Sequence, residues 1–168
     1  MPLRILLGFA AAGLWIAASS AQAQKGADTP TVAGWIEPVT FLDYGIVIEA
    51  KLDTGADSSS LGVTDLDRFK RNGKTWYRFT VRGEGGKTVT IEQQTTRIAR
   101  IRRAEVDDTF RPVVRLKICL AGQVAETDFT LTNRSERRNA VLIGRSFLAS
   151  RVLVDSGRIH IAPKCGGT

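Results

Sequence analysis

Short runs of the chain alternate between apolar and polar residues, a period-two pattern that predicts β-strands. In residues 46–52 every second side chain is apolar, whereas Glu49 and Lys51 fall on the opposite face. Residues 112–120 alternate in the same way, with basic residues on the polar face. Further strands are predicted over residues 75–81, 88–94, 96–103, 127–131, 152–154 and 158–161. Many short strands with little helix predict an all-β fold that closes into a barrel.

Glycines and two short segments interrupt this strand pattern. Three glycines between residues 82 and 87 permit positive φ, and they predict the tip of a hairpin between two of the strands. Residues 65–70 are interpreted as a single helical turn that carries Leu66 and Phe69. Residues 145–150 are interpreted as a brief helix. The predicted architecture is therefore a closed β-barrel with one or two short helices.

The first 23 residues have the organisation of a signal peptide. Arg4 provides a positive start, residues 5–18 are apolar, and Ala21 and Ala23 occupy the two positions that a signal peptidase reads. The alternative is an N-terminal membrane anchor, for which the apolar run is short. We expect cleavage after Ala23 and a periplasmic or secreted product, with no later segment apolar enough to span a membrane.

The expected domain organisation follows from this cleavage. Residues 24–33 are polar and small and are interpreted as a flexible lead-in. Residues 34–162 form one domain, and residues 163–168 form a C-terminal tail. The length of the chain suits one domain of this kind.

The charge of the chain is strongly positive. Loss of Arg4 with the signal peptide lowers the formal net charge from +7 to +6. The excess is arginine, in two stretches: positions 97, 100, 102, 103, 111 and 115, and positions 134, 137, 138, 145 and 151. Such a surface attracts acidic partners such as anionic peptides or cell-surface polymers, although a merely solvated basic surface is the alternative. No motif with interleaved aromatic residues is present, so we expect no nucleic-acid partner.

The chain contains two cysteines, Cys119 and Cys165. In an oxidising compartment they could form a disulfide that attaches the tail to a strand, and we favour this pairing. The alternative is two independent thiols, because spacing alone does not establish proximity.

The strand at residues 46–52 leads directly into Asp53-Thr54-Gly55. Peptide hydrolysis needs an activated water and a proton donor, and two carboxylates that share one proton supply both. Gly55 permits a tight turn and leaves its amide free to donate to the Asp53 carboxylate, and Thr54 offers a hydroxyl that braces the loop. The three residues alone also suit an ordinary turn.

A second segment makes the motif more specific. Residues 141–145 read Val-Leu-Ile-Gly-Arg, and together with the Asp53 loop they resemble the retropepsin-like aspartic peptidases. The resemblance covers roughly residues 34–161 and implies a barrel of the retropepsin type. It also implies that Arg145 pairs with Asp57. The residues that it assigns to substrate binding or loop support are Ala56, Asp57, Ile143, Gly144 and Arg145.

Five segments narrow the resemblance to a bacterial group labelled RimK-associated or ATP-dependent zinc protease. These segments are residues 49–61, 76–79, 111–114, 129–134 and 142–148. The residues of the chain do not support this label. His160 is the one histidine of the chain, and neither a zinc-protease helix motif nor a phosphate-binding loop occurs in it. We therefore expect no metal and no cofactor.

One Asp loop per chain is half of an active site. The resemblance implies a homodimer in which Asp53 of each subunit meets on a two-fold axis, with Thr54 bracing the opposite loop. Asp155-Ser156-Gly157 resembles a second loop, but only about ten residues follow it, too few for a second lobe, so it is interpreted as a β-turn.

Peptidases of this type cover their substrate with a mobile hairpin. The candidate flap is the hairpin tip at Gly83, Glu84, Gly85 and Gly86. An ordinary surface hairpin is the alternative reading of this tip, and residues 104–110 are an alternative lid.

These observations predict an exported aspartic endopeptidase that acts on peptides or proteins, acidic peptides included. A non-catalytic binding or scaffold module on the same fold in the cell envelope is the alternative, because fold alone does not determine function. A basic binder of envelope polymers is a third reading.

Overall fold

The computed structural model describes residues 29–103, 106–134 and 138–166. The expected signal peptide, the first half of the expected lead-in (residues 24–28), residues 104–105 of the alternative lid and the last two residues of the tail lie outside the described residues. No helix of the described part is long and apolar enough to cross a membrane.

The elements are almost all strands, which confirms the all-β prediction. The strands are β1 (Thr31–Gly34), β2 (Ile36–Phe41), β3 (Ile46–Leu52), β4 (Ser59–Gly62), β5 (Thr64–Arg71), β6 (Lys74–Arg82), β7 (Thr88–Arg103), β8 (Val106–Leu120), β9 (Gln123–Thr132), β10 (Val141–Ile143) and β11 (Val152–Asp155). The helical elements are the one-turn segments η1 (Leu42–Tyr44), η2 (Glu84–Gly86) and α1 (Arg145–Leu148).

Six strands close into a barrel in the order β2-β3-β10-β4-β9-β8, and the pairing of β2 with β8 completes the ring. Strand β10 is central to this barrel, since it pairs in parallel with β3 and antiparallel with β4. Alternate residues of each strand point inward, and Ala50, Leu61 and Val141 lie opposite one another in the buried core. The apolar periodicity of residues 46–52 is thus explained by a strand with one face in the barrel.

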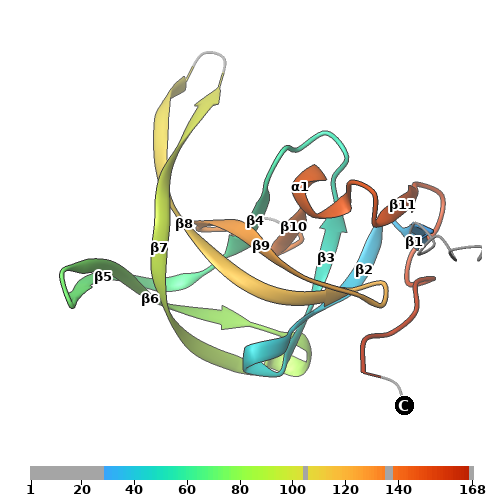
Figure 1. Ribbon diagram of the computed structural model, residues 1–168, viewed down its shortest axis with the longest axis horizontal. Coiled ribbons are helices and arrows are strands. Elements are labelled where there is room, and N and C mark those ends of the chain that lie inside the picture. Colours follow the sequence, from blue (N-terminus) through green and yellow to red (C-terminus); the bar gives the residue numbers. More distant parts are fainter. Residues whose placement is uncertain (1–28, 104–105, 135–137, 167–168) are drawn as a thin grey trace, which may run out of the picture.

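Two hairpins extend beyond the barrel (Figure 1). Strands β7 and β8 form a long arm, and β5 and β6 form a second hairpin that projects to one side. The prediction of a helical turn at residues 65–70 is wrong, because these residues belong to β5, which pairs with β6. Asn72 and Gly73 both have positive φ and make the two-residue turn that such a hairpin requires.

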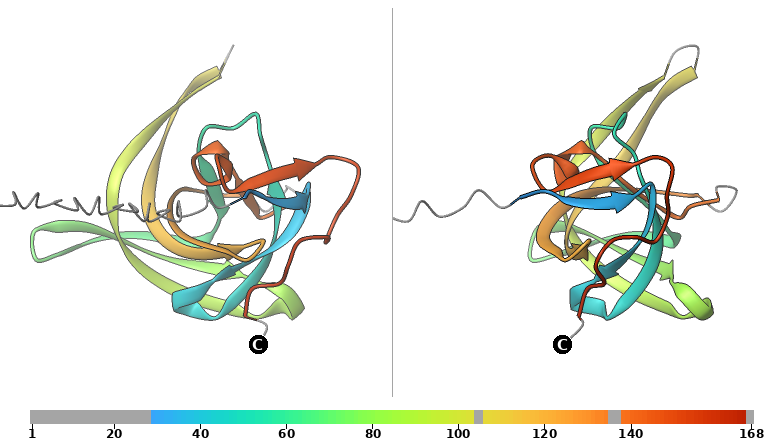
Figure 2. Two further views of the ribbon diagram at one scale, coloured as in Figure 1. Left: turned by 45° about the vertical axis from the view of Figure 1, so that its right-hand side comes forward. Right: turned by 90° about the vertical axis from the view of Figure 1, so that its right-hand side faces the viewer.

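A two-stranded parallel sheet of β1 and β11 lies beside the barrel (Figure 2). Residues 158–161, predicted as a strand, are irregular instead. The backbone amides of Ile161 and Ala162 donate to the buried Glu37 carboxylate on β2 rather than to a strand ladder. The segment from residue 158 onward is therefore held partly by the Glu37 side chain and partly by two backbone hydrogen bonds, from Trp35 to Arg158 and from His160 to Ile36.

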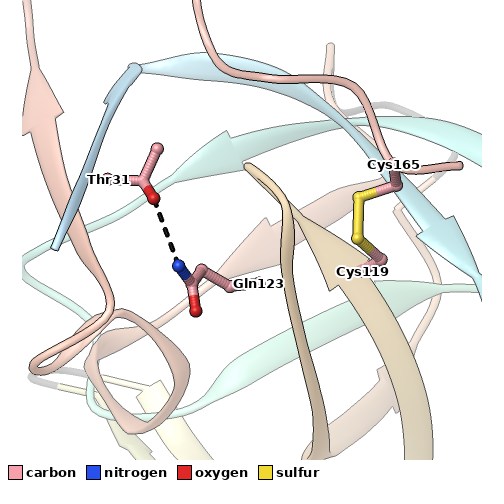
Figure 3. The surroundings of a disulfide bond; sticks show 4 residues. All are labelled: Thr31, Cys119, Gln123 and Cys165. Carbon is pink, nitrogen blue, oxygen red and sulfur yellow. Dashed lines mark hydrogen bonds between the residues drawn. A yellow bond between two sulfur atoms is a disulfide. The ribbon is translucent and has the colours of Figure 1, made fainter. Parts of the chain in front are cut away.

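The C-terminal tail is attached to the barrel by a disulfide between Cys119 of β8 and Cys165, in agreement with the favoured pairing (Figure 3). Nearby, the Gln123 side chain donates a hydrogen bond of 3.2 Å to the Thr31 hydroxyl, which links the start of β9 to β1. The two ends of the described chain are thus both connected to the β8–β9 turn region.

Candidate active site

The Asp53 loop begins where β3 leaves the barrel. The Asp53 amide donates to the Ile143 carbonyl at 2.8 Å, so the loop starts in continuous contact with β10. The Gly55 amide donates to the Asp53 carboxylate at 3.0 Å, and the Ala56 amide donates to the Asp53 carbonyl at 3.2 Å. The Asp53 side chain is 28% exposed. Its carboxylate is therefore oriented by its own loop while it remains open to solvent.

Strand β10 and helix α1 support this loop from behind. A Cβ atom on Gly144 would lie 2.6 Å from the carbonyl carbon and oxygen of Ser58, so only glycine permits this contact. The Gly144 amide donates to the hydroxyl of Ser59 at 3.1 Å. The amides of Arg145 and Ser146 continue the contact by donating to the carbonyls of residues 56 and 57. The start of α1 and the Asp53 loop therefore form one hydrogen-bonded unit.

The Arg145 side chain adds a second connection. Its guanidinium donates to the Thr54 carbonyl at 3.0 Å and to the Asp57 carboxylate. The structure thus contains the Arg145–Asp57 pair that the resemblance implied. It brings together the predicted residues Asp53, Thr54, Gly55, Ala56, Asp57, Ile143, Gly144 and Arg145.

The outer face of the same strands carries residues that the sequence did not single out. Lys51, Leu142 and Ser60 lie opposite one another across β3, β10 and β4. The Lys51 ammonium is 4.0 Å from the Asp53 carboxylate, so this row adjoins the candidate catalytic carboxylate. Arg134 donates to the Ser60 hydroxyl at 3.0 Å and extends the row. The position of Lys51 two residues before Asp53 could have indicated its place, whereas no sequence signal connects Arg134 with Ser60.

The structure does not place the candidate flap near Asp53. A Cβ atom on Gly83 would lie 2.5 Å from the Ile46 side chain, and Lys87 donates to the Gly45 carbonyl. The hairpin tip at residues 83–86 therefore packs on the start of β3, whereas Asp53 follows the end of that strand. It is a surface turn at the far end of the barrel from the Asp53 loop. This location corrects the flap prediction, because strand order rather than local turn chemistry decides where a hairpin tip lies.

Unlike the candidate flap, the β7–β8 arm lies on the side of the barrel that carries the Asp53 loop (Figures 1 and 2). It projects toward the same side of the barrel as the loop between β3 and β4 (Figures 1 and 2). Arg97 of β7 and Arg115 of β8 line a cavity together with Ser58 and Ser146, so the base of the arm adjoins the Asp53 loop and α1. Residues 106–110 of the alternative lid belong to this arm, and residues 104 and 105 lie outside the described part.

Asp155-Ser156-Gly157 forms a turn at the end of β11. The Gly157 amide donates to the Asp155 carboxylate at 2.8 Å, and Arg158 donates to it at 2.7 Å. The hydrogen bond from the Gly157 amide holds the pKa of Asp155 below its usual value, and the hydrogen bond from Arg158 has a smaller effect in the same direction. The motif therefore reproduces the local hydrogen bond of the Asp53 loop but lacks the support of β10 and α1.

The single histidine of the chain is engaged at the surface. His160 Nε2 lies 3.2 Å from the Glu49 carboxylate. Within residues 29–103, 106–134 and 138–166, no group of three or more histidine, cysteine, aspartate or glutamate residues is arranged to hold a metal ion.

Comparison with known proteins identifies relatives of this structure. Residues 32–165 match the family model described as RimB-like, the retropepsin-like aspartic endopeptidase RimB. Proteins named probable alpha-L-glutamate ligase from Shewanella pealeana and Shewanella halifaxensis are 28% and 29% identical over 132 residues, which are 76% of this chain. The match is 29% of the length of each ligase, so the chain spans about three tenths of these relatives.

A solved structure shares the fold. The crystal structure of a Legionella pneumophila protein of unknown function superposes with a TM-score of 0.66 at 29% sequence identity, and the match covers 78% of this chain and 97% of that protein. The family match spans most of the described barrel, including the Asp53 loop, β10 and α1. The chain therefore belongs to the RimB-like family of retropepsin-like aspartic endopeptidases.

Proposed function

We propose that two copies of this chain form an aspartic peptidase in which the Asp53 carboxylates of both copies meet. The observation that carries this proposal is the support of the Asp53 loop by Ile143, Gly144 and Arg145, while the carboxylate itself stays accessible. Preorganised catalytic groups are held in this way by backbone contacts behind them. A single chain supplies one such carboxylate, so the dyad requires the second copy.

The proposed reaction needs one proton shared between the two carboxylates. The ionised carboxylate removes a proton from a water molecule, whose oxygen attacks the peptide carbonyl carbon. The protonated carboxylate donates its proton to the carbonyl oxygen, which gives a neutral tetrahedral intermediate. Collapse of the intermediate breaks the C–N bond, and the amine leaves with the proton that the dyad took from water. One hydroxyl of the intermediate returns its proton to the other carboxylate and becomes the carbonyl of the product acid, which restores the shared proton of the dyad.

We propose that the substrates include acidic peptides. The row beside Asp53 contains Lys51, and Arg134 is hydrogen-bonded to its far end, so an extended peptide on this face would meet positive charge. The names of the ligase relatives supply an independent hint, because they refer to glutamate. A peptide rich in glutamate is therefore the first substrate to test.

We further propose that the protein works outside the cytoplasm. The proposal rests on the signal-peptide pattern of residues 1–23. The Cys119–Cys165 disulfide suits the same location, because disulfides persist in oxidising compartments.

The test is the pair of variants Asp53→Asn and Asp155→Asn. Each removes one carboxylate from an Asp-x-Gly turn with the same amide hydrogen bond, so the second is a matched control for the first. Hydrolysis of a glutamate-rich peptide and of its glutamine-substituted counterpart is followed by mass spectrometry. We expect Asp53→Asn to abolish cleavage without unfolding, and Asp155→Asn to retain it. Cleavage by Asp53→Asn at the wild-type rate would disprove the mechanism.

Light scattering on the same samples tests the dimer. A monomer that cleaves peptides would exclude a dyad made by two copies. A monomer that binds the peptide without cleaving it would instead indicate a binding module on the retropepsin fold.

A further inference from the structure

A cavity of about 560 Å³ lies at the end of β4 that is farther from the Asp53 loop. It is formed by Gly62 of β4, by Arg82 at the end of β6, and by Arg134 and Arg138, which flank the segment before β10. Several threonines complete its wall and add hydroxyl groups. We call this cavity the arginine pocket.

Three arginines and, among the described residues, one acidic residue, Asp65, line the arginine pocket. The Asp65 carboxylate accepts a hydrogen bond from the neighbouring Thr64 hydroxyl. Among the described residues, neither Arg82 nor Arg138 has an acidic partner within 4.0 Å. The pocket therefore offers guanidinium groups that an anion could engage.

Arg134 is held in position at this pocket. Its guanidinium donates to the Asn139 carbonyl at 3.1 Å and to the Ser60 hydroxyl at 3.0 Å. Its Cβ lies over Gly62, so that a Cβ added at position 62 would be only 2.9 Å from it. A side chain that is already ordered loses less conformational entropy when it binds a ligand.

The arginine pocket is continuous with the face that carries Asp53. Arg134 bonds to Ser60, which lies opposite Leu142, which in turn lies opposite Lys51. Neighbouring strands are about 4.8 Å apart, so Ser60 and Lys51 are separated by about 10 Å. An extended peptide advances about 3.3 Å per residue and would cover that distance with three or four residues.

We infer that the arginine pocket is a binding site for carboxylate groups, and that its occupant is an acidic side chain of an extended peptide. Guanidinium groups bind carboxylates through paired, charge-assisted hydrogen bonds, and Arg82 and Arg138, which have no acidic partner in the part of the chain that the structure describes, suit that chemistry. A free polycarboxylate could supply the same group. Carboxylate binding at the pocket does not depend on turnover, whereas its use for a substrate rests on the proposed function.

The experiment measures binding by calorimetry at low salt, in Asp53→Asn protein so that no ligand is cleaved. The ligands are hexaglutamate, tricarballylate and inorganic phosphate. The pocket variant is Arg82→Gln with Arg138→Gln. The control is Arg68→Gln with Lys117→Gln, which removes the same charge from exposed sites on β5 and β8. Circular dichroism verifies that both double variants are folded.

We expect hexaglutamate affinity to fall about tenfold or more in the pocket variant and by about twofold at most in the control. An equal loss of hexaglutamate affinity in both double variants, or no binding of any of the three ligands, would overturn the proposed site. Binding of tricarballylate but not hexaglutamate would retain the carboxylate site and overturn its peptide occupant. Phosphate binding as tight as that of both carboxylates would overturn the carboxylate assignment.

Wild-type cleavage assays separate this inference from the proposed function. If peptide cleavage persists but the pocket binds no ligand, the inference about the pocket is wrong and the peptidase proposal stands. If the pocket binds the ligands but no peptide is cleaved, the peptidase proposal is wrong and the binding site stands.

Discussion

The guanidinium of Arg145 hydrogen-bonds to the carboxylate of Asp57 across 88 residues of sequence. The same guanidinium donates to the carbonyl of Thr54, so one side chain holds two points of the Asp53 loop. A planar guanidinium can bridge two acceptors in fixed directions, whereas an ammonium group is a single point charge. The contact joins the start of α1 to the loop and does not contribute to the barrel core.

Arg145→Lys should therefore impair function more than stability. The Arg145 and Asp57 side chains are 52% and 89% exposed, so their pairing contributes only about 0–1 kcal/mol to the free energy of unfolding. We expect peptide cleavage to fall about tenfold or more, because the loop loses the side chain that bridges Thr54 and Asp57. Arg158→Lys at the Asp155 turn is the matched control and should leave cleavage unchanged. Equal activity of both variants would contradict a positioning role for Arg145.

Gly144→Ala tests the packing between β10 and the Asp53 loop. Gly144 has an extended backbone, with φ of −94°, so alanine meets no backbone strain there and acts only through its Cβ. That atom would clash with the Ser58 backbone, and we expect a loss of about 1–3 kcal/mol in urea unfolding together with lower activity. Gly157→Ala is the control, because its Cβ would lie 3.4 Å from one carboxylate oxygen. A fully stable, active Gly144→Ala protein would show that the loop can move away.

Glu37 tests how the C-terminal segment is held. Its side chain is buried, and one carboxylate oxygen accepts the amides of Gly34, Ile161 and Ala162 at 2.7, 2.9 and 3.0 Å. Glu37→Ala would leave these donors unpaired, at about 1–3 kcal/mol each, so we expect a loss of at least about 3 kcal/mol. Glu37→Gln keeps an oxygen acceptor and should lose less. Equal losses in urea unfolding would argue that charge rather than hydrogen bonding matters here.

The Asp155 turn predicts that the stability of the fold depends on pH. The Gly157 amide and Arg158 hold the pKa of Asp155 below its usual value of 3.8. A carboxyl whose pKa is lower in the folded state stabilises the fold above its unfolded pKa, and this contribution disappears as the pH falls through the folded value.

The stability of the wild type should therefore exceed that of Asp155→Asn at neutral pH, and the two should converge in acid below pH 3.8. Thermal unfolding from neutral pH into acid provides the measurement. Arg158→Gln should narrow the difference only in part, because the Gly157 hydrogen bond remains. A constant difference at every pH would contradict the role assigned to this carboxyl.

Local patterns predicted some elements well and others badly. Strand β3 is found at residues 46–52 as expected, because apolar alternation reports directly on a strand with one buried face. Residues 65–70 were misinterpreted because the three-residue spacing of Leu66 and Phe69 is also that of a helical turn. In the structure Phe69 packs against Trp76 across the hairpin, a contact that local spacing does not reveal.

The candidate site shows the same division. The sequence alone determined the Asp53-Thr54-Gly55 turn and the positive charge of the chain, because turn chemistry acts over a few neighbouring residues. The supporting role of the Ile143-Gly144-Arg145 segment was implied by the resemblance to retropepsins rather than by local chemistry. Only the tertiary structure decided that the tip at residues 83–86 lies away from Asp53, that the β7–β8 arm lies on the same side as the loop, and that Arg82, Arg134 and Arg138 share one cavity. These relationships depend on strand order and barrel closure, which join residues far apart in the chain.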